Sequence, residues 1–270
     1  MNDLKYQSIM YICLLILFII IINIIIINSI NTKYYTKYAL LKLIPEKYVP
    51  KTILYNEIID LENLNYPLIF KTNKCDSYGF LVEKINNYKE ALKYINKYPF
   101  NKKNIIIQDY VPYNNEVGIF IYRDLITNKF NILSAVIKNT NNIIKIGCLN
   151  SNCIDITNMV GEKLINVINN ISSNIKGLNW GRYDIKYKDL NSLLNGKFYI
   201  LELNDDFPSN LTVTTNLKKN PVKSIYIFIK TYLLRIIISI KNICLLKINL
   251  YDLFMKILYF LSFIECTMYM

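Results

Sequence analysis

Histidine is absent from this chain of 270 residues, and glycine and proline are scarce, with 7 of each. The absence of histidine excludes catalytic triads and general bases built on imidazole, and it removes the side chain on which most zinc sites depend. The 6 cysteines contain no Cys-x-x-Cys pair, so neither a zinc site nor a disulfide framework is predicted. Reduced, structural thiols are the simplest interpretation, and they are typical of a cytosolic domain.

Apolar and basic residues are abundant instead. Hydrophobic residues make up 53% of the chain, enough for a substantial core, and the formal net charge is +12. The lysines are scattered and form no dense run with interleaved aromatic residues, so no nucleic-acid partner is predicted. The heavy use of isoleucine, asparagine, lysine and tyrosine is typical of an AT-rich genome and says little about the fold.

An uncharged segment near the N-terminus is long enough to cross a membrane. Residues 9–30 are almost wholly aliphatic and follow a short tail, residues 1–8. A helix needs about 20 such residues to span a bilayer. A cleaved signal peptide is the alternative, but its apolar region is normally shorter and ends in small residues. Lysines that follow the segment favour a single-pass anchor with the rest of the chain in the cytoplasm.

Two polar-studded strands are the most informative feature of the chain. Residues 181–186 and 199–204 both alternate apolar with charged or polar side chains. Side chains two apart on a strand share a face, so Arg182 lies beside Asp184 and Glu202 beside Asn204. If the strands pair, one surface carries two carboxylates, an amide and a guanidinium. Such oxygen ligands suit Mg²⁺ together with substrate phosphates, so the pattern indicates a nucleoside triphosphate site. The alternative is a surface strand pair with a salt bridge between Arg182 and Glu202.

The rest of the body predicts a mixed α+β fold. Strands are expected at residues 67–71, 80–82, 105–108, 116–123, 130–138 and 143–146, with a polar loop at 72–79. Asn87 is expected to cap a helix that runs to about Lys97. Asp155 or Thr157 is expected to begin a second helix, because the apolar positions from Val160 to Ile171 keep helical spacing.

Six of these segments, taken in order, resemble the ATP-grasp superfamily over residues 66–210. Within this superfamily, the segments most resemble the D-alanine–D-alanine-ligase-like and carboxylate–amine-ligase-like members. The matching segments are Tyr66-Pro-Leu-Ile-Phe-Lys71, Asp76-Ser77-Tyr78-Gly79-Phe80, Ile107-Gln108-Asp109-Tyr110-Val111-Pro112, the strand containing Glu116 and Arg123, the strand ending at Lys138, and the strand pair described above.

The resemblance implies an ATP-grasp fold of two small lobes, preceded by the transmembrane helix and followed by apolar helices. Residues 31–62 are then a connector or vestigial N-terminal part. Residues 63–112 are the first lobe, residues 113–215 are the second lobe with the metal site, and residues 216–270 form C-terminal amphipathic helices. These helices are expected either to pack on the domain or to lie on the membrane.

The resemblance also implies roles for individual residues. The cofactors are ATP and Mg²⁺ or Mn²⁺, and the function is ligation of a carboxylate to an amine or thiol through an acyl phosphate, a step that needs no histidine. The metal ligands are Asp184, Glu202 and Asn204. The catalytic residues are Arg182, Lys138 and Arg123. The nucleotide contacts are Lys71, Ser77, Gly79, Gln108, Asp109, Val111 and Glu116.

Two departures from the family pattern leave other functions open. The loop that covers the phosphates has a single glycine, Gly79, where relatives have more, and residues 31–62 are too short for the N-terminal lobe that helps many relatives to bind substrate. A non-catalytic, membrane-tethered binding protein and a kinase on the same fold are therefore the alternatives. Neither the acceptor carboxylate nor the nucleophile is indicated by the sequence.

Overall fold

The computed structural model describes residues 36–56, 58–73, 81–124, 126–138, 153–205, 211–217 and 221–245. The chain divides into two compact units, Asn31–Thr231 and the combination of Met1–Ile30 with Tyr232–Met270. Both β-sheets belong to the unit Asn31–Thr231. The predicted anchor (residues 9–30), the strand predicted at 143–146, and Ser77 and Gly79 lie outside the described residues. Among the residues that are described, no helix is both long and apolar enough to cross a membrane.

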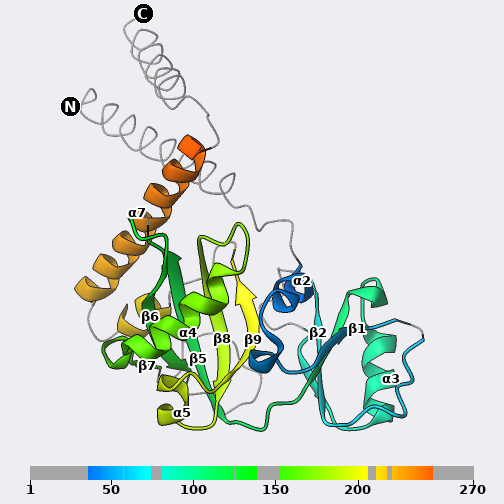
Figure 1. Cartoon of the computed structure of the whole chain (residues 1–270). Coiled ribbons are helices and arrows are strands. Elements are labelled where there is room, and N and C mark those ends of the chain that lie inside the picture. Colours follow the sequence, from blue (N-terminus) through cyan, green and yellow to red (C-terminus); the bar gives the residue numbers. More distant parts are fainter. Residues whose placement is uncertain are drawn as a thin grey trace, which may run out of the picture. The chain divides into compact units, whose positions relative to one another are not determined.

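The first sheet has four strands, in the order β1-β4-β2-β3. They are β1 (Thr52–Leu54), β2 (Leu68–Thr72), β3 (Glu83–Ile85) and β4 (Ile105–Asp109), and each neighbouring pair is antiparallel. The helix α3 (Tyr88–Lys97) covers one face of this sheet (Figure 1), and it begins where the sequence predicts, because the Asn87 side chain accepts a hydrogen bond from the Glu90 amide. A separate core forms here around Phe70, Tyr94 and Ile107.

The second sheet has five strands, in the order β7-β6-β5-β8-β9. They are β5 (Asn115–Arg123), β6 (Phe130–Lys138), β7 (Ile154–Asp155), β8 (Trp180–Tyr187) and β9 (Tyr199–Asn204). The helices α4 (Glu162–Ser173) and α5 (Leu190–Leu194) accompany this sheet, with α4 packed against β6. Tyr183, Ile185, Leu164 and Ile168 belong to the buried core between them.

Residues 36–54, within the segment predicted as a connector, contribute both to the core of the five-stranded sheet and to the four-stranded sheet. The helix α2 (Lys37–Lys42) places Leu40 and Leu41 in the core of the five-stranded sheet, where they are 1% and 3% exposed. The short helix η1 (Glu46–Tyr48) follows, and β1 then pairs with β4 of the other sheet. The described chain is completed by η2 (Lys102–Asn104), η3 (Thr157–Met159), α6 (Leu211–Leu217) and α7 (Pro221–Leu245).

Two predictions of local structure and one of cysteine chemistry are wrong. The strand expected at residues 80–82 begins three residues later, at Glu83, after Leu81 adopts a positive φ of 65° that breaks an extended strand. The helix expected from Asp155 or Thr157 begins at Glu162, because a 3₁₀ turn and Gly161 at the N-cap come first. Cys153 is disulfide-bonded and so is not a reduced thiol.

Candidate functional site

The antiparallel pairing of β8 with β9 assembles the predicted metal ligands. Asp184 lies opposite Glu202, and Arg182 lies opposite Asn204. A β-bulge between Asp184 and Ile185 shifts the register along the rest of the pair. The sequence prediction that these four side chains share one face is therefore confirmed. The same face continues onto β5, where Glu116 is paired with Lys138 of β6.

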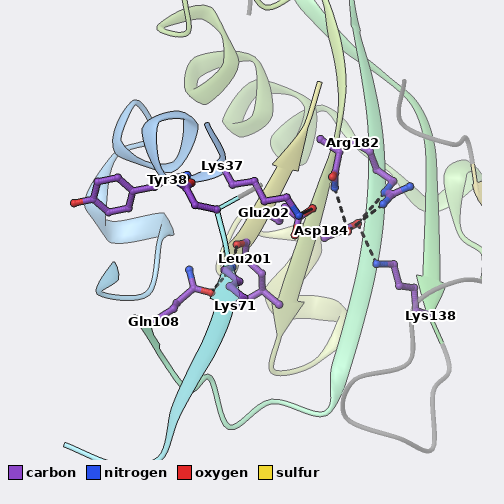
Figure 2. Close-up of polar contacts among 11 residues, drawn as sticks. Lys37, Tyr38, Lys71, Gln108, Lys138, Arg182, Asp184, Leu201 and Glu202 are labelled. Atoms are coloured by element: carbon purple, nitrogen blue, oxygen red, sulfur yellow. Dashed lines mark hydrogen bonds and ion pairs between the residues drawn. The ribbon is translucent and has the colours of Figure 1, made fainter. Parts of the chain in front are cut away.

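Asp184 is the electrostatic centre of this face (Figure 2). Its Oδ1 atom accepts from Arg182 Nε at 2.9 Å and lies 3.0 Å from Lys138 Nζ, and its Oδ2 atom accepts from Arg182 Nη2 at 3.2 Å and from Asn204 Nδ2 at 3.4 Å. Burial works to raise the pKa of the Asp184 carboxyl, but the charges of Arg182 and Lys138 outweigh it, so that pKa is lowered. Asp184 is therefore a carboxylate throughout the physiological range.

Lys138 bridges the aspartate to the predicted ribose ligand. Its Nζ atom donates to Glu116 Oε1 at 2.7 Å in addition to its ion pair with Asp184. Burial favours the neutral amine, yet the two carboxylates outweigh this effect and raise the pKa of Lys138. Gly118 faces Asp184 across β5 and β8. A Cβ atom at this position would lie 2.5 Å from Leu211 Cδ1 and 3.3 Å from Arg182 Cδ, so the missing side chain leaves room first for Leu211 and then for the aliphatic part of Arg182.

Lys71 reaches the same region from the four-stranded sheet. Its Nζ atom donates to Gln108 Oε1 at 2.9 Å and to the Leu201 carbonyl of β9 at 2.8 Å, so it connects the two sheets. Gln108 is held in turn by donating from Nε2 to Thr52 Oγ1 at 2.9 Å. Burial lowers the pKa of Lys71 to about 8, with nearby Glu202, Asp184 and Glu116 opposing this shift. Gln108 thus orients the lysine, and its predicted contact with adenine stays a prediction.

Lys37 is a member of this group that the sequence analysis missed. Its Nζ atom lies 3.1 Å from Glu202 Oε1. The next residue, Tyr38, donates its amide to Asn73 Oδ1 at 2.9 Å, just beyond the end of β2. The available signal was Thr36, an N-cap residue followed by apolar positions at helical spacing, which indicates a helix beginning at Lys37. Nothing in the sequence indicated that this helix packs beside β9.

The predicted hinge residues Asp109 and Val111 line a pocket of about 390 Å³. This volume lies within the range of small-molecule sites. Asp109 is exposed, whereas the preceding Gln108 is buried, as expected for neighbours that point to opposite faces of a strand. The other lining residues are Glu46, Lys47, Val49, Pro50, Lys51, Tyr110, Pro112 and Tyr199.

Arg123 does not join the group. It stands at the far end of β5, seven residues or about 23 Å of strand from Glu116. Its Nε and Nη2 atoms donate to the Leu178 carbonyl at 3.1 and 3.0 Å, and the guanidinium lies 4.5 Å from the centre of the Phe130 ring. The side chain contacts structural partners at the other end of the strand, so these contacts give no support to its predicted catalytic role, which stays a prediction.

The donor set fits Mg²⁺ only together with ligands from a substrate. Asp184, Glu202 and Asn204 offer two carboxylates and one amide, all oxygen donors, and the two carboxylate side chains retain 14% and 23% exposure. Within the described ranges, no group of three or more His, Cys, Asp or Glu side chains could hold a metal ion. Mg²⁺ commonly binds to one or two carboxylates while water and substrate phosphates complete its shell. The surrounding cations Lys37, Lys71, Lys138 and Arg182 suit such phosphates.

Comparison with known proteins returns matches among solved structures alone. No family model matches the sequence, and no curated protein matches it. A D-alanine–D-alanine ligase from Bacillus anthracis complexed with ATP is 18% identical, with a TM-score of 0.46 over 73% of this chain and 65% of that one. An L-amino acid ligase from Bacillus licheniformis is 16% identical, with a TM-score of 0.48 over 66% of this chain and 42% of that one.

A third match is described as an ATP-grasp superfamily protein from Archaeoglobus fulgidus, at 16% identity and a TM-score of 0.41, covering 68% of this chain and 48% of that one. Of these three matches, the third is the one whose description names the superfamily that the sequence resembles. The chain spans less than two thirds of the length of each of these three proteins. At such identities and TM-scores, the case for a function depends on the site itself.

Proposed function

We propose that this protein is an ATP- and Mg²⁺-dependent ligase that activates a carboxylate as an acyl phosphate for attack by an amine or a thiol. The observation that carries the proposal is the pairing of β8 with β9, which sets Asp184 against Glu202 and Arg182 against Asn204 on one face. Four cationic side chains from both sheets and α2 converge on that face. Carboxylates flanked by cations are the arrangement that a metal–triphosphate complex requires.

Each group has a task in this proposal. Asp184, Glu202 and Asn204 would hold Mg²⁺, which neutralises phosphate charge when bound. Lys71 and Lys138 would contact phosphate oxygens. Arg182 would stabilise the charge on the transferring phosphoryl group, since its guanidinium offers several donors in a fixed plane. Glu116 would accept hydrogen bonds from the ribose hydroxyls.

The chemistry balances without a histidine. An oxygen of the acceptor carboxylate attacks the γ-phosphorus, and the bond between that phosphorus and the β–γ bridging oxygen breaks to release ADP. The amine or thiol then attacks the acyl carbon, and inorganic phosphate leaves as its bond to that carbon breaks. The proton that the nucleophile loses passes to the departing phosphate or to water. Because the acceptor is already ionised, the first step depends on positioning and charge neutralisation.

The binding of a nucleotide requires an exchange of partners. Asp184 is engaged by Arg182 and Lys138, and Glu202 is engaged by Lys37. Phosphates entering between these groups would draw the ammonium groups away from the carboxylates, which would then be free to bind the metal. The ion pairs therefore keep the buried charges of the nucleotide-free site compensated.

The same ion pairs favour one alternative. Because both carboxylates already have cationic partners, the site is electrostatically satisfied without a metal. A non-catalytic, membrane-tethered binding protein that retains the fold is therefore the second candidate. In either case we propose that residues 9–30 anchor the protein and that the two sheets face the cytoplasm. The lysines after the anchor favour this orientation, whereas the disulfide at Cys153 is untypical of the cytoplasm.

Turnover separates the two candidates. We expect the full chain, solubilised in mild detergent, to release ADP and phosphate from ATP in the presence of Mg²⁺ and a pool of candidate carboxylates and amines. Glu202→Gln should abolish this release, whereas Phe100→Ala, at an exposed position away from the site, should retain it. If Glu202→Gln turned over ATP as fast as the unmodified protein, the assigned metal site would be wrong. If the unmodified protein bound MgATP but released no ADP with any of the acceptors, the non-catalytic candidate would be favoured.

A further inference from the structure

The helix α7 (drawn in orange in Figure 1) carries an exposed apolar face that no part of the proposed reaction uses. Along its first turns, Val222, Ile225, Tyr226 and Ile229 are 76%, 58%, 62% and 50% exposed. These positions recur at intervals of three and four residues, so they lie along one side of the helix. Leu233 continues the same spacing and is 50% exposed. A stripe of large apolar side chains facing water indicates an interaction surface.

The opposite side of α7 is fixed. Ser224 is 1% exposed, and its Oγ atom donates to the Val213 carbonyl of α6 at 2.6 Å. Thr231, about two turns further along, is 6% exposed. Leu211 of α6 is in turn buried against Val136 of β6. These contacts fix the orientation of the first turns of α7 about the helix axis. The exposed stripe therefore stays on the side of the helix that faces solvent.

Charge identifies the partner that suits this face. The 25 residues of α7 include Lys223, Lys230, Arg235 and Lys241 but no acidic residue. Lys223, Lys230 and Lys241 recur at intervals close to two and three helical turns, so the spacing places them along one line of the helix. Lys230 is exposed and neighbours the apolar stripe. An apolar stripe that contains one aromatic residue, Tyr226, and has lysines at its side fits a helix lying in the interface of an anionic bilayer.

We propose that α7 lies along an anionic membrane surface, with the stripe formed by Val222, Ile225, Tyr226 and Ile229 in the acyl-chain boundary and Lys230 at the lipid headgroups. The basic, acid-free composition favours an anionic bilayer over a second copy of this chain, because two such helices would repel each other. The contact is independent of the proposed ligase activity. It would give the protein a second membrane contact in addition to the proposed anchor at residues 9–30, and the two contacts together would orient the domain on the bilayer.

A local probe distinguishes this contact from any membrane contact made elsewhere. Ile229→Trp would place an indole in the stripe, and Phe100→Trp would place one at an exposed position beside α3 as the matched control. The native Trp180 is 2% exposed and supplies a constant background. Both full-length variants are reconstituted into vesicles of phosphatidylcholine with brominated acyl chains, with and without about a third of phosphatidylglycerol.

We expect the Ile229→Trp emission to shift to shorter wavelength and to be at least halved by brominated lipid in anionic vesicles, while the Phe100→Trp emission stays unchanged. Adding Lys230→Glu to the Ile229→Trp variant should reverse most of this quenching. Equal emission of the two tryptophan variants in brominated and unbrominated vesicles would overturn the proposal. A blue-shifted Ile229→Trp spectrum in detergent without lipid, together with a dimer in sedimentation, would show that a second copy covers the stripe and would also overturn it.

Discussion

At the scale of single residues, Asp184 organises the candidate site because two cations meet at one of its oxygen atoms. Arg182 Nε lies 2.9 Å and Lys138 Nζ lies 3.0 Å from Asp184 Oδ1. Lys71 is different, since its nearest partners are the neutral oxygens of Gln108 and Leu201. Neutral oxygens compensate a buried ammonium less than carboxylates do, which is why Lys71 has a lowered pKa while Lys138 has a raised one.

The titration of Lys71 should be visible in nucleotide binding. Burial lowers its pKa to about 8, so the ammonium is mostly charged at pH 7 and mostly neutral at pH 9. Only the charged form attracts phosphate, so affinity is lost as the pH rises through 8. We expect the dissociation constant of MgATP, measured by calorimetry, to rise about tenfold between pH 7 and pH 9.

Lys71→Arg is the control for this titration, because a guanidinium stays charged over the whole range. It should give a nearly flat profile between pH 7 and pH 9. A dissociation constant of the unmodified protein that does not change over these two pH units would contradict the assigned role of Lys71.

Substitutions of Arg123 and Arg182 should have different effects, the first on the free energy of unfolding and the second on MgATP binding. Arg123→Met removes two hydrogen bonds to the Leu178 carbonyl and the contact with Phe130, so we expect it to lower the free energy of unfolding by about 1–3 kcal/mol. MgATP affinity should change less than about twofold. Arg182→Met should instead weaken MgATP binding by about tenfold or more. Urea denaturation and calorimetry on both variants test this, and the reverse pattern would place Arg123 in the site.

At the scale of elements, the prediction that succeeded is the shared face of the candidate metal ligands, and it depends on the alternation of side chains on β8 and β9. A period of two defines the faces of a strand from sequence alone, so the shared face of Arg182, Asp184, Glu202 and Asn204 followed once the strands were paired. The helix α2 shows where this reasoning ends. Its sequence indicates a helix, but its contact with β9 depends on tertiary packing, so the ion pair of Lys37 with Glu202 could not be predicted.

The predictions of a strand at residues 80–82 and of the start of the second helix failed for local reasons. Leu81 has a positive φ, which is uncommon for a residue with a branched side chain and is not announced by its sequence. Before α4, the apolar Ile156 and Val160 keep a helical spacing but pack on the core from a 3₁₀ turn and its flank. Apolar periodicity therefore identified which residues face the core, whereas the helix boundary was set by Gly161.

The packing of α2 can be tested through stability. Leu41 is 3% exposed within the core of the five-stranded sheet, so Leu41→Ala should lower the free energy of unfolding by about 2–5 kcal/mol. Leu43, at the C-cap of the same helix, is 36% exposed, and Leu43→Ala should change stability by less than about 0.5 kcal/mol. Urea denaturation of the two variants compares them directly. Equal stabilities would mean that α2 is a connector that does not contribute to the core.

At the scale of the whole molecule, the candidate site is assembled from segments far apart in the chain. Lys37 from α2, Lys71 from the four-stranded sheet, and Asp184 and Glu202 from the five-stranded sheet converge over a sequence separation of 165 residues between Lys37 and Glu202. Such a convergence brings the charged groups together before any substrate arrives, although nucleotide binding still requires the carboxylates to exchange their cationic partners. The proposal of a ligase therefore depends on one claim, that this charged face binds a nucleotide through Mg²⁺.

The magnesium dependence of nucleotide affinity tests that claim most directly. We expect the full chain in mild detergent to bind a non-hydrolysable ATP analogue at least about tenfold more tightly with Mg²⁺ than with EDTA, as measured by isothermal titration calorimetry. Asp184→Asn and Glu202→Gln should each remove this difference while the cationic side chains still bind the free analogue. If magnesium gave the same enhancement in these variants as in the unmodified protein, or no enhancement in any of them, the account of the site would be contradicted.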